Sequence, residues 1–104
     1  MTPADVTTTA AALPRAWDSH ELAQVGPARV KVLRMNELPL APEAHHTDET
    51  LLVMAGEMRL TLDGRAVTMR AGELCVIPAG TTHAVESGSH GTLLLVEIPD
   101  EGDG

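Results

Sequence analysis

Cysteine, aromatic residues and basic residues are all scarce in this 104-residue chain. The one cysteine, Cys75, excludes an internal disulfide framework and is typical of a protein from a reducing compartment. No hydrophobic run is long enough to span a membrane. The N-terminus has neither the basic region nor the apolar region of a signal peptide, so we expect a cytoplasmic protein.

The shortage of basic residues limits the partners that we expect. Seven Lys and Arg stand against 15 Asp and Glu, which gives a formal net charge of −8 at pH 7. Nucleic acids and anionic membrane surfaces repel such a chain, so neither is an expected partner. A small-molecule ligand stays compatible with this charge, because bulk charge says nothing about the inside of a pocket.

Trp17 is the one aromatic residue, since the chain contains neither Phe nor Tyr. The core therefore has to be filled by Leu, Val, Ile and Met. A pocket in such a core has aliphatic and thioether walls, and it lacks an aromatic floor on which sugars or flat rings would stack. We expect Trp17 to cap one end of the fold, to pack across a dimer, or both.

Short apolar or alternating segments separated by turn residues fill the middle of the chain. They predict strands at residues 29–35, 50–54, 58–62, 66–69, 74–77, 82–86 and 92–98. Ala55-Gly56 is expected to break the second strand from the third, and Asp63-Gly64 predicts a hairpin. No segment has a helical stripe, so the pattern predicts a small antiparallel β fold.

The length predicts one domain, over residues 15–99. Residues 1–14 have no periodicity and little bulk, and they predict a flexible N-terminal arm. Residues 100–104 predict an acidic C-terminal tail.

A glycine, a short apolar run and a Pro-x-Gly turn precede His83. Gly72 permits a turn with positive φ, and residues 74–77 predict a buried strand. Pro78 and Gly80 end that strand with a tight turn. A new strand then begins at His83, where alternation directs the imidazole inward as a candidate metal ligand.

A second set of candidate ligands lies upstream, in the segment that contains Glu43, His45 and Glu49. Glu49 has the same parity as Leu51 and Val53, which places it on the core face of a predicted strand. A buried carboxylate is costly unless it is paired or coordinates a metal, so a ligand role is the physical interpretation of Glu49.

The two segments resemble the two motifs of the cupins, H-x-H-x3–4-E-x6-G and G-x5-P-x-G-x2-H-x3-N. Glu43 replaces the first histidine, Ser87 replaces the asparagine, and Gly56 fits the glycine of the first motif. The resemblance covers roughly residues 28–98. It implies an all-β double-stranded β-helix, also called a jelly-roll barrel, that forms a homodimer.

By the same resemblance, His45, Glu49 and His83 are ligands of one divalent metal, Fe, Mn, Ni or Zn, and Glu43 is a fourth ligand or a general base. Two alternatives stay open: His46 takes the place of Glu43, or the site is empty.

Three functions fit these residues. The first is a metal-dependent enzyme of the dioxygenase, isomerase, decarboxylase or lyase class that acts on a small oxygen-bearing molecule. The second is a non-catalytic module that binds or senses a small molecule. The third is a structural dimer with a relic site.

Overall fold

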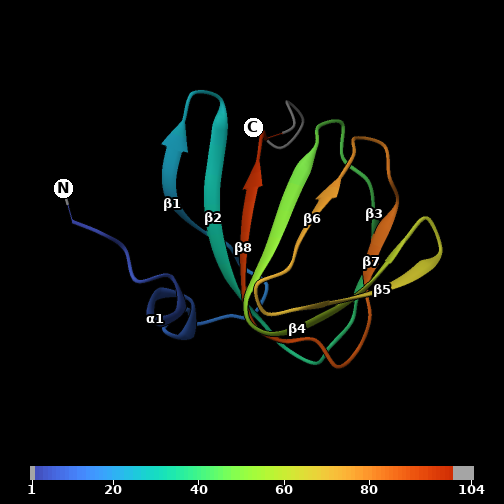
Figure 1. Cartoon of the computed structure of the whole chain (residues 1–104), viewed down its shortest axis with the longest axis horizontal. Helices are drawn as coiled ribbons and strands as arrows, with labels where there is room; N and C mark the ends of the chain where they lie inside the picture. Colours follow the sequence, from blue (N-terminus) through green and yellow to red (C-terminus); the bar gives the residue numbers. More distant parts are fainter. Residues whose placement is uncertain (1, 100–104) are drawn as a thin grey trace.

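The computed structural model describes residues 2–99, and within that range it forms one short helix and eight strands (Figure 1). In chain order these are α1 (Val6–Ala11), β1 (His20–Val25), β2 (Ala28–Met35), β3 (Leu40–Glu43), β4 (Glu49–Leu62), β5 (Arg65–Arg70), β6 (Leu74–Ile77), β7 (His83–Val85) and β8 (His90–Glu97). The helix is far too short to cross a membrane, and the described range holds no other candidate span.

All the strands belong to one antiparallel sheet in the order β1-β2-β8-β4-β7-β3, and β5 and β6 also pair with β4. The first half of β4 pairs with β6 and β8, and its second half pairs with β5 and β7. The sheet therefore folds round on itself along β4, with β2 and β8 on one side and β3 and β7 on the other (Figure 1). The predicted all-β class is confirmed.

β4 differs from the sequence prediction, because one bent strand replaces two strands separated at Ala55-Gly56. Its register with β8 shifts between Val53 and Ala55, and Gly56 has a φ of 81°. A Cβ at Gly56 would lie 2.2 Å from the carbonyl oxygen of His90 on β8. Glycine thus lets the strand bend against its neighbour without ending it.

The core lies between the two sides of the folded sheet and is aliphatic, as the composition predicts. Its buried members are Leu33, Met35, Leu51, Val53, Met58, Leu60, Met69, Ile77, Val85, Leu93 and Leu95. Full burial of each such side chain stabilises the fold by about 1.5–3 kcal/mol. Leu51 and Val53 on β4 are buried on the side that the period-two pattern predicted to face the core.

The N-terminal arm is more ordered than the sequence predicts. The side chain of Asp5 accepts a hydrogen bond of 3.0 Å from the backbone N–H of Thr8 and caps α1. Ala10 is fully buried, and α1 contacts β2 and β8. A helix this short buries only one small residue, so it has no stripe to detect. The predicted acidic tail, residues 100–104, lies outside the described residues.

The sequence also failed to predict β1 and β3, which are the edges of the sheet order. Both strands are mostly exposed, so neither shows a hydrophobic alternation. β3 contains Pro42, a residue that sheets tolerate at edges because it cannot donate a ladder hydrogen bond. β3 matters for function, since it ends at Glu43.

Candidate metal centre

His45 and His83 belong to two loops that the backbone ties together. The N–H of Gly80 donates to the carbonyl of His45 at 2.8 Å, and the N–H of Ala79 donates to Oδ1 of Asp48 at 2.8 Å. Gly80 has a φ of 82°, a conformation that favours glycine. The Pro-x-Gly turn therefore both ends β6 and docks the His45 loop beside the start of β7.

Strand pairing brings the third residue to the same place, because Glu43 and His83 are Cα partners across β3 and β7. Oε1 of Glu43 lies 3.4 Å from Nε2 of His45 and 3.6 Å from Nε2 of His83. One ligand atom from each of the three residues lies within 4.8 Å of the other two. The imidazole centroids are 5.4 Å apart. This cluster, Glu43, His45 and His83, is the candidate metal triad.

The triad lies at the boundary between the protein interior and solvent. The side chain of Glu43 is 59% exposed, that of His45 is 28% exposed and that of His83 is 10% exposed. An ion can therefore reach the triad from the Glu43 side, while the imidazole of His83 stays fixed within the fold.

A hydrogen bond assigns the tautomer of His83. Its Nδ1 lies 3.1 Å from the carbonyl oxygen of Thr81. A carbonyl only accepts, so Nδ1 carries the hydrogen, and in the neutral ring Nε2 presents a lone pair. That lone pair faces the Glu43 carboxylate, which is a second acceptor. Two acceptors at this distance need a proton or a cation between them, and the Nδ1 bond orients the ring as in metal-bound histidines.

The triad opens onto a cavity of about 250 Å³ between the two sides of the sheet. Aliphatic side chains from β2, β4, β7 and β8 form about half of its wall. Besides the triad, the cavity is lined by Trp17, Ser19, Glu49 and Glu97. The cavity surface is thus about equally polar and apolar, so the site places several polar groups beside an aliphatic surface.

Glu49 lines this cavity but lies outside the triad. Burial raises its pKa to about 7, and the hydrogen bond and negative charge of Glu97 add to this shift. The charge of Glu43 also raises the pKa, whereas His45 lowers it. In the absence of a cation, Glu49 therefore holds a proton at pH values where an ordinary glutamate is ionised.

Sequence reasoning missed Glu97. It is the Cα partner of Glu49 across β4 and β8, and its Oε1 lies 2.6 Å from Nζ of Lys31. The signal was present, because Glu97 continues the alternation of Leu93 and Leu95, both of which line the cavity. This alternation was not extended to Glu97 in the prediction from the sequence.

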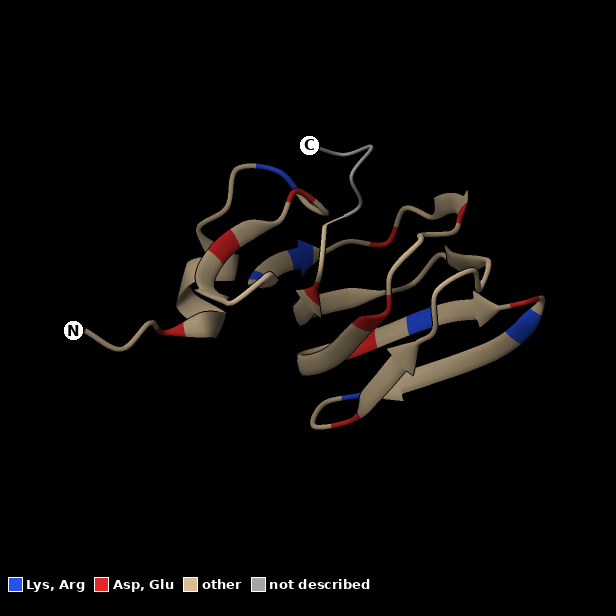
Figure 2. Ribbon diagram, turned by 90° about the horizontal axis from the view of Figure 1, so that it is seen from above, with Lys and Arg blue, Asp and Glu red and all other residues tan. Residues whose placement is uncertain are grey.

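The structure places Glu43 on the cavity, while His46 is exposed and does not line it. Arg34 and Arg59 do not line the cavity. Arg34 donates to a backbone carbonyl of the N-terminal segment, and Arg59 pairs with Glu57. Acidic residues are spread over the ribbon and are not confined to one segment (Figure 2).

Residues 32–99 match the family model of the cupin domain. The chain belongs to the cupin domain family. The match begins in β2 and runs past the end of β8, so it includes all residues of the triad together with Glu49 and Glu97.

Solved cupin structures confirm the jelly-roll fold. A cupin-2 domain protein from Shewanella frigidimarina superposes with a TM-score of 0.83 at 21% identity, covering 92% of this chain and 94% of that one. A protein from Neisseria meningitidis superposes with a TM-score of 0.80 at 21% identity, covering 94% of this chain and all of that one. At such identities the likeness shows the fold alone.

A curated relative of this cupin is quercetin 2,3-dioxygenase from Bacillus subtilis. The two are 43% identical over 49 residues, which is 47% of this chain. The cupin spans only 14% of the length of that enzyme.

Proposed function

We propose that Glu43, His45 and His83 bind one divalent metal ion and that the centre makes this cupin a metal-dependent enzyme for a small oxygen-bearing molecule. The observation that carries the proposal is the convergence of three ligand atoms, two of them acceptors held face to face at Nε2 of His83 and Oε1 of Glu43. A metal cation satisfies both acceptors at once, without a proton.

The ligand groups restrict the identity of the metal ion. Two imidazoles with one carboxylate suit Fe, Mn, Ni or Zn in the divalent state. Glu49 is proposed as a fourth ligand, which reaches the ion after its proton is displaced. Of the two roles that the sequence predicts for Glu43, the distances to both histidines support that of ligand rather than general base.

The partial likeness to quercetin 2,3-dioxygenase supports the dioxygenase class within this proposal, for the matched segment only. A divalent metal held by Glu43, His45 and His83 would supply Lewis-acid activation or bind oxygen. The protein contributes the aliphatic part of the cavity wall, and Glu49, whose pKa is raised to about 7, holds a proton beside the centre in the absence of the ion.

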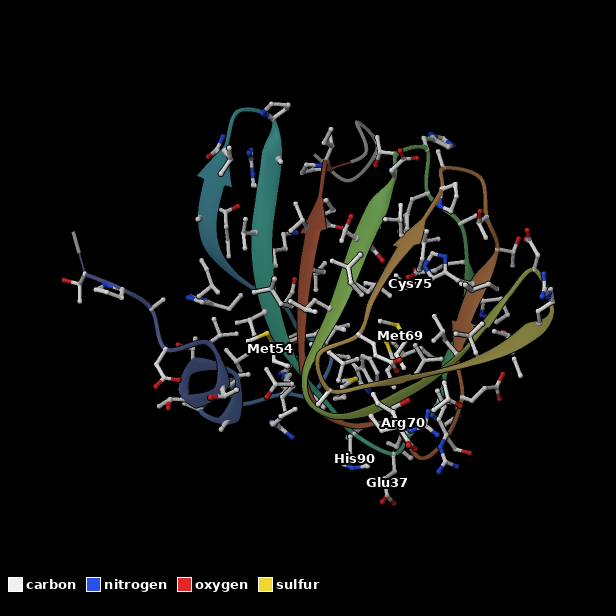
Figure 3. All side chains as sticks on the ribbon, viewed as in Figure 1. Glu37, Met54, Met69, Arg70, Cys75 and His90 are labelled. Atoms are coloured by element: carbon white, nitrogen blue, oxygen red, sulfur yellow. The ribbon has the colours of Figure 1, made fainter. Side chains whose placement is uncertain are left out.

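Metal content per chain tests the proposal, measured by elemental analysis of untagged protein purified without chelator. The wild type should contain close to one equivalent of one ion, and His83→Ala should contain almost none. His90→Ala is the matched control, because His90 is exposed, lies at the lower end of the sheet in Figure 3 and does not line the cavity.

Two further results would redirect the interpretation. Negligible metal in the wild type, with no uptake from any of the four candidate ions, would contradict the metal centre. Stoichiometric metal together with small-molecule binding that survives removal of the metal would instead favour the non-catalytic binding module.

A further inference from the structure

Trp17 adopts a backbone conformation that is unusual for a bulky residue. Its φ is 71°, in the left-handed region, which is a genuine outlier for such a side chain. Conformations of this kind are strained, persist only where the surroundings impose them, and gather at ligand clamps and active sites.

Two hydrogen bonds impose the conformation of Trp17. Its backbone N–H donates to the carbonyl of Arg34 at 2.8 Å, and its indole Nε1 donates to Oδ1 of Asn36 at 2.8 Å. The same Oδ1 of Asn36 accepts from the N–H of Leu38 at 3.1 Å, so the acceptor is itself held in place. Both the backbone and the ring of Trp17 are therefore fixed.

The fixed indole forms part of the cavity wall. It lines the cavity together with Leu33 of β2 and Leu40 of β3, two strands that do not pair with each other. Trp17 itself belongs to no strand, so this part of the wall comes from the segment before β1. Its indole is also the largest side chain of the wall, whose other aromatic groups are the imidazoles of His45 and His83.

The cavity is small, so the side chain of Trp17 affects which ligands fit in it. Pockets for drug-sized ligands have volumes of roughly 300–1,000 Å³, whereas this cavity has about 250 Å³. An indole is the largest side chain that a protein can place in a wall. Replacement of Trp17 by a smaller residue should therefore enlarge the cavity.

We propose that Trp17 is a specificity-determining residue, whose fixed indole restricts the ligand of the metal centre to small aliphatic molecules and excludes polycyclic ones. The inference rests on the proposed function in so far as the restricted ligand is one that binds the metal. The restriction itself is steric and acts on the cavity with or without the ion.

Two ligands that share one metal-binding group but differ in size test the restriction. Nickel-loaded wild type is titrated by calorimetry with acetohydroxamic acid and with 2-naphthohydroxamic acid. Trp17→Gly removes the indole and suits the positive φ, and Trp17→Leu keeps an apolar group in case the glycine variant does not fold. Leu74→Ala is the control, since Leu74 is exposed on β6 and does not line the cavity.

The wild type and Leu74→Ala should prefer the small hydroxamate, and the Trp17 variants should reduce that preference by about tenfold or more. An unchanged preference in every folded Trp17 variant would overturn the inference.

A second experiment, on metal-free protein, tests this inference independently of the proposed function. Metal-free proteins are titrated with cyclohexanol and with 2-naphthol while the backbone amide resonances of Leu93 and Leu95 are followed by NMR. Only the Trp17 variants should respond to 2-naphthol. If nickel does not bind, the metal centre fails, and this second experiment still decides whether Trp17 limits the cavity. Equal responses of wild type and variants to 2-naphthol would overturn the restriction.

Discussion

Glu49 and Glu97 face each other across β4 and β8, and their carboxyl groups are hydrogen-bonded inside the cavity. Burial and the neighbouring Glu97 together raise the pKa of Glu49 to about 7. Lys31 holds Glu97 from the other side at 2.6 Å. The metal-free centre therefore stores a proton where a cation would otherwise balance the negative charge.

The stored proton predicts how the stability of the metal-free protein depends on pH. Below the unfolded-state pKa of 4.5, Glu49 is protonated in both states and adds no pH dependence. Between 4.5 and about 7 the unfolded state binds fewer protons than the folded state, so the free energy of unfolding falls as pH rises. Above about pH 7 the contribution levels off, with the charged form buried at full penalty.

Urea unfolding of the chelator-treated protein from pH 4.5 to 8 measures this dependence. Glu49→Gln should remove much of the decline, because an amide does not ionise. Glu86→Gln, at an exposed position after β7, should leave the decline as in the wild type. A decline of the same size in wild type and Glu49→Gln would show that Glu49 is not its source.

Metal binding should displace the same proton. Below pH 7 a cation that recruits the Glu49 carboxylate has to compete with the proton, so metal affinity should rise with pH. Between pH 5 and 7 the plot of log affinity against pH should be steeper for the wild type than for Glu49→Gln, by up to about one proton. Competition with a chromophoric chelator at fixed pH values gives the affinities. Equal slopes would exclude Glu49 from the set of ligands.

The parts of the fold that the sequence predicted are those where burial imposes an alternation. Glu49 shares the inward face with Leu51 and Val53 as its parity indicated. Strand β6 has the predicted bounds, but the prediction that it is buried was wrong, because Leu74 and Val76 are exposed. The edge strands β1 and β3 were not predicted, because most of their side chains are exposed and their sequences show no hydrophobic alternation. The local sequence of an exposed edge strand does not indicate which residues it will pair with.

The candidate site also contains some residues that the sequence predicted and others that it did not. Motif spacing singled out Glu43, His45 and His83, which strand pairing and loop contacts bring together. Glu97 and Trp17 line the same cavity but lie outside both motifs, and their places depend on tertiary contacts that spacing does not encode. The predicted homodimer stays a prediction.

The contact between the two loops of the site should matter for metal affinity. Oδ1 of Asp48 accepts from the N–H of Ala79, which holds the His45 loop against the turn before His83. Asp48→Ala should weaken metal binding by roughly 10–100-fold, as expected when a group that orients the ligands is lost. Asp18→Ala, an exposed position outside the cavity, is the control. Unchanged affinity in Asp48→Ala would mean that other contacts suffice to hold the loop.

The bend of β4 should depend on the absence of a side chain at Gly56. Gly56 and Gly72 have nearly the same φ, 81° and 86°, so alanine at either position incurs a similar backbone strain of about 1–2 kcal/mol. Their surroundings differ, because a Cβ at Gly56 would lie 2.2 Å from the carbonyl oxygen of His90, whereas a Cβ at Gly72 would meet nothing within 4 Å.

Gly56→Ala should therefore destabilise the protein more than Gly72→Ala. The additional loss should be about 1–3 kcal/mol, because the backbone of β8 has to move. Thermal and urea unfolding of the two variants measure the difference. Equal losses of stability would mean that β4 and β8 separate easily at this point, and the close crossing of the strands would then not be what fixes the bend.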